Sequence, residues 1–252
     1  MLRALLVVLP SLTMKSVTTG ICQSPALQIF VALSMVNEMR LPSETGVTVL
    51  IAAHNEEKTI GEVVKACLGA PSVNNVWVVA DKCDDTTANV AYKAGGRIIK
   101  TPYGNKGSAV YEALHHCNDY VLLMDADLEG LRPDHVENLA TQHPYSMVVG
   151  IRGKEVHRLK SMMPFGDMPI GGERRVPRDL LFEANINGSG YRMEMKINKC
   201  AKKNFVPVDY VWMDGVGQVT QYKKWDFRES VIKDVTRWKD VFAELVNSRP
   251  LW

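Results

Sequence analysis

The chain has 252 residues, of which 46% are apolar, and its 30 Lys and Arg residues nearly balance its 28 Asp and Glu residues. A chain of this length can bury one sizeable core, and a net charge of +2 gives no support for a nucleic-acid-binding protein. The five cysteines are scattered and never spaced as Cys-x-x-Cys, which argues against a disulfide framework or a structural zinc and suits a reducing compartment. We therefore expect an ordinary globular, cytoplasmic protein that does not bind nucleic acid, with a peripheral contact to a membrane as the alternative location.

Residues 1–45 are expected to be an N-terminal extension outside the folded domain. The apolar runs in "MLRALLVVLP" and "ALQIFVALSMV" are each shorter than the ~20 residues that a membrane-spanning helix needs. Arg3 and the first run have the outline of a signal peptide, while disorder, an interfacial helix or a true start at Met35 or Met39 are the alternatives. The sequence leaves these alternatives open, including that the segment is not native to the protein.

From residue 46 onward, apolar runs typical of buried strands alternate with segments of helical periodicity. The run "VTVLIAAHNEE" (47–57) predicts a strand and a polar turn, and Ile60, Val63, Val64, Cys67 and Leu68 then repeat at helical spacing. Further strands are predicted within 75–85 and at 96–100, 120–124 and 145–150, and helices at 86–94, 105–117 and 133–141. Strands that alternate with helices form a mostly parallel sheet with right-handed crossovers. The sequence thus predicts an α/β fold with a central sheet flanked by helices.

Three polar clusters follow predicted strands directly: "HNEE" (54–57), "DKCDD" (81–85) and "DADLE" (125–129). In open parallel sheets, ligands bind outside the carboxyl ends of the strands. Because all three clusters stand at such ends, we expect them to form one site at one edge of the sheet.

The cluster after the fourth strand has the composition of a metal site. Asp125, Asp127 and Glu129 offer only hard oxygen ligands, which suit Mg²⁺ or Mn²⁺, and the small Ala126 lets a diphosphate come close. The alternative is a solvated acidic turn that caps the next helix, and the two companion clusters favour the metal site.

Residues near the other strand ends are candidates for nucleotide binding. Asp81 is placed to accept hydrogen bonds from a base or ribose, unless it forms only an Asx turn or a helix cap. Lys106 and Gly107 begin a helix, where a cation and backbone N–H groups would neutralise a diphosphate, and a solvated surface lysine is the alternative. His54 adjoins Asn55 in the first turn, where it would touch a nucleotide.

Four segments together carry a family resemblance: "VTVLIAAHNEEKTIGEVV", "VVADKCDDTTANVAYKAG", "GNKGSAVYEAL" and "VLLMDADLEGLRPDHVENL". In order and spacing they resemble glycosyltransferase family 2 across roughly residues 46–150. The second half is similar more loosely, through "GGERRVPRDLLFE" and "GYRMEMKINKCAKKNFVPVDYV". The nearest resemblance is to the soluble branch related to polyprenyl-phosphate mannose and glucose synthases. It implies the GT-A fold, a UDP- or GDP-sugar donor, a divalent metal and transfer of a hexose.

The resemblance also implies roles for individual residues. Those that would hold the nucleoside are Ala53, Asn55, Glu56 and Asp81. Lys106, Gly107 and Ala126 would lie near the phosphates, and the metal and diphosphate would be held by Asp125, Asp127 and Glu129. Arg174 and Glu194 would face the sugar or acceptor, with Glu194 as the first candidate for a catalytic base.

The chain departs from the family pattern at several positions. Ala53 stands where the family usually has Pro, and Ala80 replaces the first aspartate of the acidic pair after the second strand. Neither the family's Glu-Asp base motif nor a His-Arg pair in the late loop "MDGVGQVTQYKKW" is evident. The choice of nucleotide, the catalytic base and the stereochemical outcome therefore stay open.

The acceptor and two rival functions also stay open. A polyprenyl phosphate is already ionised and needs no base, whereas a small hydroxyl acceptor does need one. One rival is a sugar-nucleotide nucleotidyltransferase, although "AAHNEEKTI" lacks the Gly-rich phosphate loop that such an enzyme needs. The other rival is a non-catalytic homologue that binds a nucleotide sugar.

We expect a single domain over 46–252, with a nucleotide-sugar-binding half at 46–150, an acceptor half at 151–225 and a C-terminal helix at 226–250. In the last segment, apolar residues recur at helical intervals: Phe227, Val231, Ile232, Val235, Trp238, Val241, Phe242 and Leu245. Such a helix most often packs on its own domain or on a second copy in a homodimer, and a membrane surface is the alternative.

Overall fold

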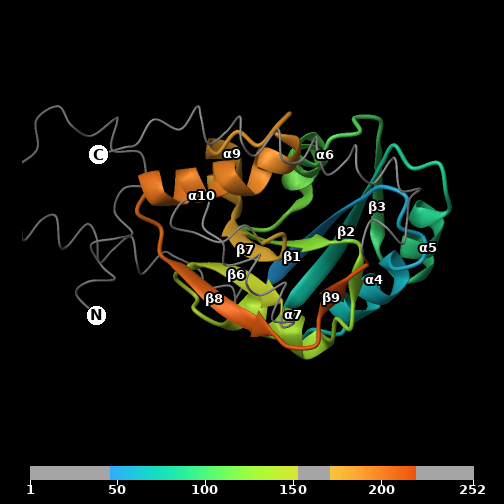
Figure 1. Ribbon diagram of the computed structural model, residues 1–252, viewed down its shortest axis with the longest axis horizontal. Helices are drawn as coiled ribbons and strands as arrows, with labels where there is room; N and C mark the ends of the chain where they lie inside the picture. The colour runs from blue at the N-terminus through green and yellow to red at the C-terminus, as the bar shows by residue number, and fades with distance from the viewer. Residues whose placement is uncertain (1–45, 153–170, 220–252) are drawn as a thin grey trace, which may run out of the picture.

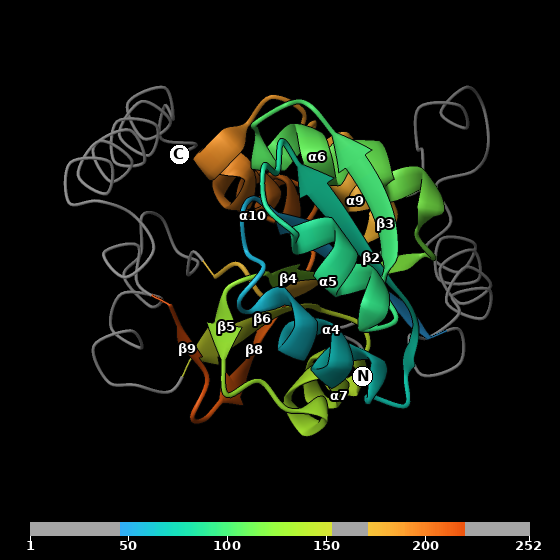
Figure 2. The same cartoon turned by 90° about the vertical axis from the view of Figure 1, so that its right-hand side faces the viewer.

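The structure is a computed structural model that describes residues 46–152 and 171–219. Within these residues a central sheet lies between two layers of helices (Figures 1 and 2). The strands of this sheet are β1 (Val47–Ala53), β2 (Val73–Asp81), β3 (Arg97–Thr101), β4 (Tyr120–Asp125), β6 (Met147–Arg152), β7 (Arg174–Pro177) and β8 (Val208–Met213). The α-helices are α4 (Ile60–Leu68), α5 (Thr87–Lys93), α6 (Lys106–Ala113), α7 (Pro133–Thr141), α9 (Arg178–Glu183) and α10 (Met193–Lys203). A separate two-stranded sheet pairs β5 (Leu128–Glu129) with β9 (Gly217–Gln218).

The strand order of the central sheet is β3-β2-β1-β4-β7-β6-β8. Neighbouring strands run parallel except where β7 pairs antiparallel with both β4 and β6. The predicted mostly parallel α/β sheet is therefore confirmed. The sequence analysis missed β7, because its residues "RRVP" lack the apolar run that marks the other strands.

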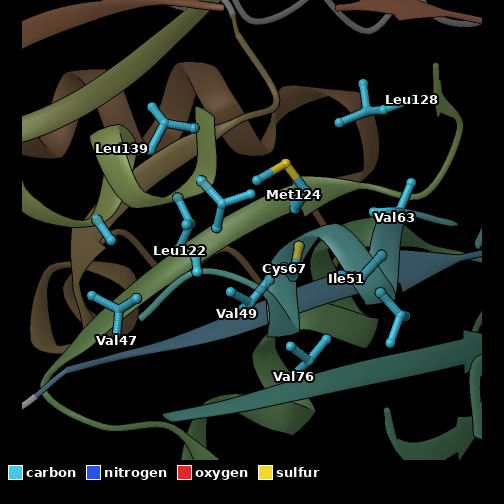
Figure 3. Close-up of a cluster of buried hydrophobic side chains, with 14 of the residues drawn as sticks. Val47, Val49, Ile51, Val63, Cys67, Val76, Leu122, Met124, Leu128 and Leu139 are labelled. Carbon is cyan, nitrogen blue, oxygen red and sulfur yellow. The ribbon is translucent and has the colours of Figure 1, made fainter. Parts of the chain in front are cut away.

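Two apolar cores hold the helices on the sheet. Successive side chains of a strand point to opposite faces, so Val49 and Ile51 of β1 enter one core while Leu50 enters the other. The first core, shown in Figure 3, includes Val63 and Cys67 of α4 and lies on the face that α4 and α7 cover. The second lies under α6, α9 and α10. Burial on both faces explains why the strands read as continuous apolar runs.

The predicted elements correspond closely to the observed ones in the first half of the described chain. The helix predicted at 133–141 has the bounds of α7, and the one predicted at 105–117 divides into α6 and a 3₁₀ turn, Leu114–His116. A second 3₁₀ turn, Gly190–Arg192, leads into α10. β5 and β9 were missed because strands of two residues are too short to show an alternating pattern.

The predicted N-terminal extension (1–45) and C-terminal helix (226–250) lie outside the described residues. The division of the chain into halves therefore stays a prediction. None of the helices in the described part of the chain is both long and apolar enough to cross a bilayer.

Candidate active site

The carboxyl ends of β1, β2 and β4 lie side by side, as the sequence predicted. In the strand register Ala53 pairs with Ala80, and Ala52 pairs with Asp125. The residues that end or follow these strands, including Asp81, Asn55 and Asp127, therefore lie at one edge of the sheet. This edge is called the rim below.

Asp81 is an internal anchor of the rim. The residue is 4% exposed, and its carboxylate accepts hydrogen bonds from the Thr101 hydroxyl (2.9 Å) and from the backbone N–H groups of Gly104 (3.0 Å) and Asn105 (2.8 Å). These three bonds fix the loop that leads from β3 to the start of α6. The nucleoside contact implied for Asp81 stays a prediction, and it would have to share these oxygens.

The first turn of α6 is fixed by a side-chain cap and by close packing. The Asn105 side-chain oxygen accepts hydrogen bonds from the N–H groups of Ser108 (3.1 Å) and Gly190 (3.2 Å). A Cβ atom on Gly107 would collide with the Ile186 carbonyl oxygen, so only glycine allows the helix to approach that turn so closely. Both contacts hold the start of α6 against the segment that precedes α10.

Lys106, the first residue of α6, joins the rim to α10. Its ammonium nitrogen lies 2.9 Å from Asp125 Oδ1 and 2.9 Å from Glu194 Oε1. Burial alone would lower the pKa of Lys106, but the charges of Asp125 and Glu194 outweigh it and raise the pKa above the usual range. Burial likewise opposes ionisation of Asp125, yet the charges of Lys106 and Arg152 hold its pKa down at about 2. The structure thus brings together three residues that the sequence predicted for the phosphates, the metal and the acceptor.

A second ion pair lies beside Asp125. Glu173 is fully buried, and Arg152 Nε lies 3.5 Å from Glu173 Oε2. Among the described residues, neither carboxylate oxygen of Glu173 has a hydrogen-bond partner, and burial raises the pKa of Glu173 to about 7 although Arg152 opposes the shift. The neighbouring Gly172 packs directly on Asp125, because a Cβ atom there would collide with the Asp125 carboxylate.

Asp127 is held by Gln218. The Gln218 side-chain N–H group donates to both Asp127 oxygens, at 2.8 and 3.0 Å, and Arg152 donates to the Gln218 side-chain oxygen at 3.0 Å. The backbone supports the same arrangement, because β5 pairs with β9 and Val219 N–H donates to the Asp127 carbonyl at 3.0 Å. The second aspartate of the predicted metal site is therefore tied to the end of β6 through a single amide.

The remaining members of the predicted metal site differ in exposure. Ala126 is buried, whereas Glu129 is exposed on β5. Within 46–152 and 171–219, no three His, Cys, Asp or Glu side chains are gathered into a ready-made metal cluster. Mg²⁺ commonly uses one or two carboxylates, several waters and the phosphates of a substrate instead of an all-protein cage. Asp125 and Asp127 have the chemistry of such a site, and the role of Glu129 stays a prediction.

Arg174 lies beneath the rim and not on its surface. It is fully buried, its Nε donates to the Gly171 carbonyl at 2.8 Å, and its NH1 donates to Asn198 Oδ1 at 2.9 Å. Burial lowers the pKa of Arg174, and the charges of Glu194 and Glu173 oppose that shift. In this position the guanidinium ties the start of β7 to α10, and the sugar contact implied for it stays a prediction.

Asn55 and Glu56 form the turn after β1. Asn55 has a left-handed backbone (φ 56°), and its side-chain oxygen accepts a hydrogen bond from Asp84 N–H at 2.9 Å. The Glu56 N–H donates to the Thr87 hydroxyl at 2.8 Å. The turns after β1 and β2 are therefore bonded together beside Ala53, where the sequence predicts the nucleoside.

The sequence analysis missed Arg152, Glu173 and Gln218. Arg152 ends the apolar strand β6 at the carboxyl edge, and this is the same signal that drew attention to Asp125. Glu173 stands within the quoted segment "GGERRVPRDLLFE", but nothing in that segment indicates that its carboxylate faces Asp125. Gln218 carries no sequence signal, since its contact with Asp127 spans 91 residues.

Comparison with known proteins places the chain in a family. A model of the family described as "Glycosyl transferase family 2" matches residues 48–193. A curated relative, 4,4'-diaponeurosporenoate glycosyltransferase of Staphylococcus aureus (strain USA300), is 31% identical over 103 residues. That match covers 38% of this chain and 28% of the relative, so the chain spans well under a third of that protein.

Solved structures of glucosyl-3-phosphoglycerate synthase from Mycobacterium tuberculosis share the fold. A complex with Mn²⁺, UDP-glucose and phosphoglyceric acid is 18% identical with a TM-score of 0.60, and the match covers 82% of each chain. A complex with phosphoglyceric acid is 20% identical with a TM-score of 0.55, covering 69% of this chain and 72% of that one. These likenesses confirm the GT-A fold, while the branch of polyprenyl-phosphate sugar synthases stays a prediction. Because the family model covers more than half of its residues, the chain belongs to glycosyl transferase family 2.

Proposed function

We propose that this chain transfers a hexose from a nucleotide-diphospho-sugar to an acceptor, with a divalent cation at Asp125 and Asp127. The observation that carries the proposal is the position of Lys106, which lies 2.9 Å from a carboxylate of the rim and 2.9 Å from a carboxylate of α10. A partly buried cation between two carboxylates, at the carboxyl edge of a parallel sheet, suits a site that binds a diphosphate and an acceptor together.

The residues present fit a hard divalent cation. Asp125 and Asp127 provide carboxylate oxygens at the rim, and Glu129 is the further ligand that the sequence predicts. When bound, Mg²⁺ or Mn²⁺ would stabilise the negative charge that develops on the leaving diphosphate.

The chain's own residues would have separate roles in stabilising the leaving group, accepting a proton and holding the nucleoside. Lys106 keeps its positive charge, because Asp125 and Glu194 raise its pKa, and would add to the stabilisation of the leaving phosphate. Glu194, at the start of α10, is the candidate to accept a proton from an acceptor hydroxyl. Asn55 and Glu56, in the turn beside Ala53, would hold the nucleoside.

The acceptor remains a proposal among three chemical classes. Phosphoglyceric acid is bound in the similar synthase structure, 4,4'-diaponeurosporenoate is named in the curated relative, and the sequence resemblance points to a polyprenyl phosphate. An ionised phosphate acceptor would make Glu194 dispensable as a base, whereas a hydroxyl acceptor would require it. The effect of Glu194→Gln on transfer therefore distinguishes a hydroxyl acceptor from an acceptor whose attacking oxygen is already ionised, whether phosphate or carboxylate.

The test is calorimetric titration of UDP and GDP, with and without Mn²⁺, followed by transfer assays with UDP-glucose and GDP-mannose. Metal and nucleotide should bind with positive coupling, because each supplies part of the other's site, and such coupling is reciprocal. Transfer to one of the three acceptor classes should be lost with EDTA. Nucleotide affinity that ignores Mn²⁺ would refute the metal site. Tight, metal-dependent binding without transfer or donor hydrolysis would instead indicate a non-catalytic nucleotide-sugar binder.

A further inference from the structure

Arg152 contacts both sides of the proposed metal site from the end of β6. Its Nε lies 3.5 Å from Glu173 Oε2, and its NH1 donates to the Gln218 side-chain oxygen at 3.0 Å. The Arg152 side chain is 15% exposed and Glu173 is fully buried, so this network is largely shielded from water. Glu173 in turn follows Gly172, whose backbone packs on the Asp125 carboxylate.

The amide of Gln218 has two chemically opposite ends, and Arg152 holds the oxygen end while Asp127 accepts from the nitrogen end. A guanidinium can only donate, so it binds the amide oxygen and leaves the N–H₂ group to point the other way. That group lies 2.8 and 3.0 Å from the two Asp127 oxygens, and it therefore fixes the plane of the carboxylate. Without Arg152 the amide oxygen would lose its donor, and the N–H₂ group would no longer be held at a fixed position against Asp127.

The backbone supplies the spacing that this contact needs. Gln218 lies on β9 opposite Leu128 of β5. Because Leu128 directly follows Asp127 in the chain, this strand pairing keeps Gln218 next to Asp127. Arg152 comes from the central sheet, where β6 is paired with β7 and β8. These contacts form an Arg152–Gln218–Asp127 relay. The relay connects the small β5–β9 sheet, next to the proposed metal ligand Asp127, to the central sheet.

We propose that Arg152 is a positioning residue that sets the metal affinity of the site by orienting Asp127 through Gln218. This role rests on the proposed function, because it concerns the affinity of the same site for its cation. Hydrogen-bonding partners of metal ligands typically contribute 10–100-fold to metal affinity. A competing possibility is that the Gln218 N–H₂ group merely occupies the place of the cation, and this makes the opposite prediction.

The experiment measures Mn²⁺ affinity by calorimetry in the presence of UDP, for wild type, Gln218→Ala, Arg152→Lys and the double variant. Each single variant should weaken Mn²⁺ binding about 10–100-fold. UDP affinity in EDTA and the thermal midpoint should change little in Gln218→Ala, because Gln218 is partly exposed. The double variant should bind Mn²⁺ no more weakly than the worse single variant, because both changes break one relay.

The control is Arg132→Lys, which makes the same substitution in an exposed Arg–carboxylate pair with Asp134 and should leave Mn²⁺ affinity unchanged. Tighter Mn²⁺ binding by Gln218→Ala would show that the amide competes with the cation and would overturn the proposal. Unchanged affinity in Gln218→Ala, or fully additive losses, would overturn it as well. Should Arg152→Lys fail to fold, Gln218→Ala alone still shows whether the relay strengthens or weakens Mn²⁺ binding. A wild-type protein without coupling between Mn²⁺ and UDP would overturn the proposed function and this role with it, whereas coupled binding with unchanged Mn²⁺ affinity in both variants would overturn only the role of Arg152.

Discussion

Replacing Lys106 by Met should destabilise the fold more than the same substitution at an exposed lysine. The side chains of Lys106, Asp125 and Glu194 are 29%, 16% and 9% exposed, so the substitution leaves two carboxylates partly buried without their shared cation. Removing one partner of a buried ion pair costs about 3–5 kcal/mol, and the partial exposure of Lys106 favours the lower end, about 3 kcal/mol. For a domain of about 150–250 residues this corresponds to a loss of roughly 6–12 °C in the thermal midpoint.

The matched control is Lys65→Met. Lys65 lies 2.8 Å from Glu62, nearly the same distance as in the Lys106 pairs, but the two side chains are 63% and 79% exposed. An exposed pair of this kind contributes about 0–1 kcal/mol, so the midpoint should barely move. Scanning calorimetry compares the variants, and Glu194→Gln added to Lys106→Met should restore part of the loss by removing one unpaired charge. Equal midpoints for Lys106→Met and Lys65→Met would refute the argument that burial gives the Lys106 bridge its strength.

Three further outcomes are expected. Asp127→Asn should abolish the coupling between Mn²⁺ and nucleotide in calorimetric titrations while the metal-free protein keeps its thermal midpoint, because the amide preserves the shape but not the charge of a hard-cation ligand; retained coupling would exclude Asp127 as a ligand. Gly107→Ala should cost about 1–3 kcal/mol in urea unfolding, because the added Cβ would collide with the Ile186 carbonyl, whereas Gly217→Ala, with nothing within 4 Å of its Cβ, should be nearly neutral. The pKa of Asp125 is about 2 in the folded chain, against an ordinary 3.8, so the unfolded chain takes up this proton first and stability falls as the pH drops from about 4 toward 2. Asp125→Asn should remove this acid-induced loss of stability, which amounts to about 2 kcal/mol. An unaltered dependence of stability on pH would contradict the low pKa of Asp125.

Local sequence pattern sufficed for strands β1, β2, β3, β4 and β6 and for the edge that carries the site. β1 and β4 are apolar on both faces, so their residues form unbroken runs, and the polar residues after each run mark where the strand ends. The parallel arrangement then brings Asn55, Asp81 and Asp125 to one rim, because crossover connections return each strand in the same direction. These inferences need only neighbours in the sequence.

Long-range side-chain contacts were beyond the reach of the sequence. Asp81 has the same strand-end position as a nucleotide-binding acid, but its oxygens accept hydrogen bonds from the loop before α6. The family resemblance singled out Arg174, but the sequence did not show that this side chain is buried. Its burial depends on β7, which has no apolar run of its own. Contacts such as Lys106 with Glu194, 88 residues apart, follow from the tertiary fold and leave no local periodicity.

The antiparallel strand β7 has a consequence for how this chain folds during synthesis. β3, β2, β1 and β4 all precede residue 126 and pair only with one another until β7 arrives. Until then the outer edge of β4 presents unpaired backbone groups. β6 also stays separate from the sheet of β1 to β4, because β7 is the strand that joins β6 to β4. A ribosome-bound chain that ends before β7 would therefore expose an unpaired strand edge that is prone to aggregation. We expect folding during synthesis to need either rapid synthesis of "RRVP" or a chaperone that covers that edge.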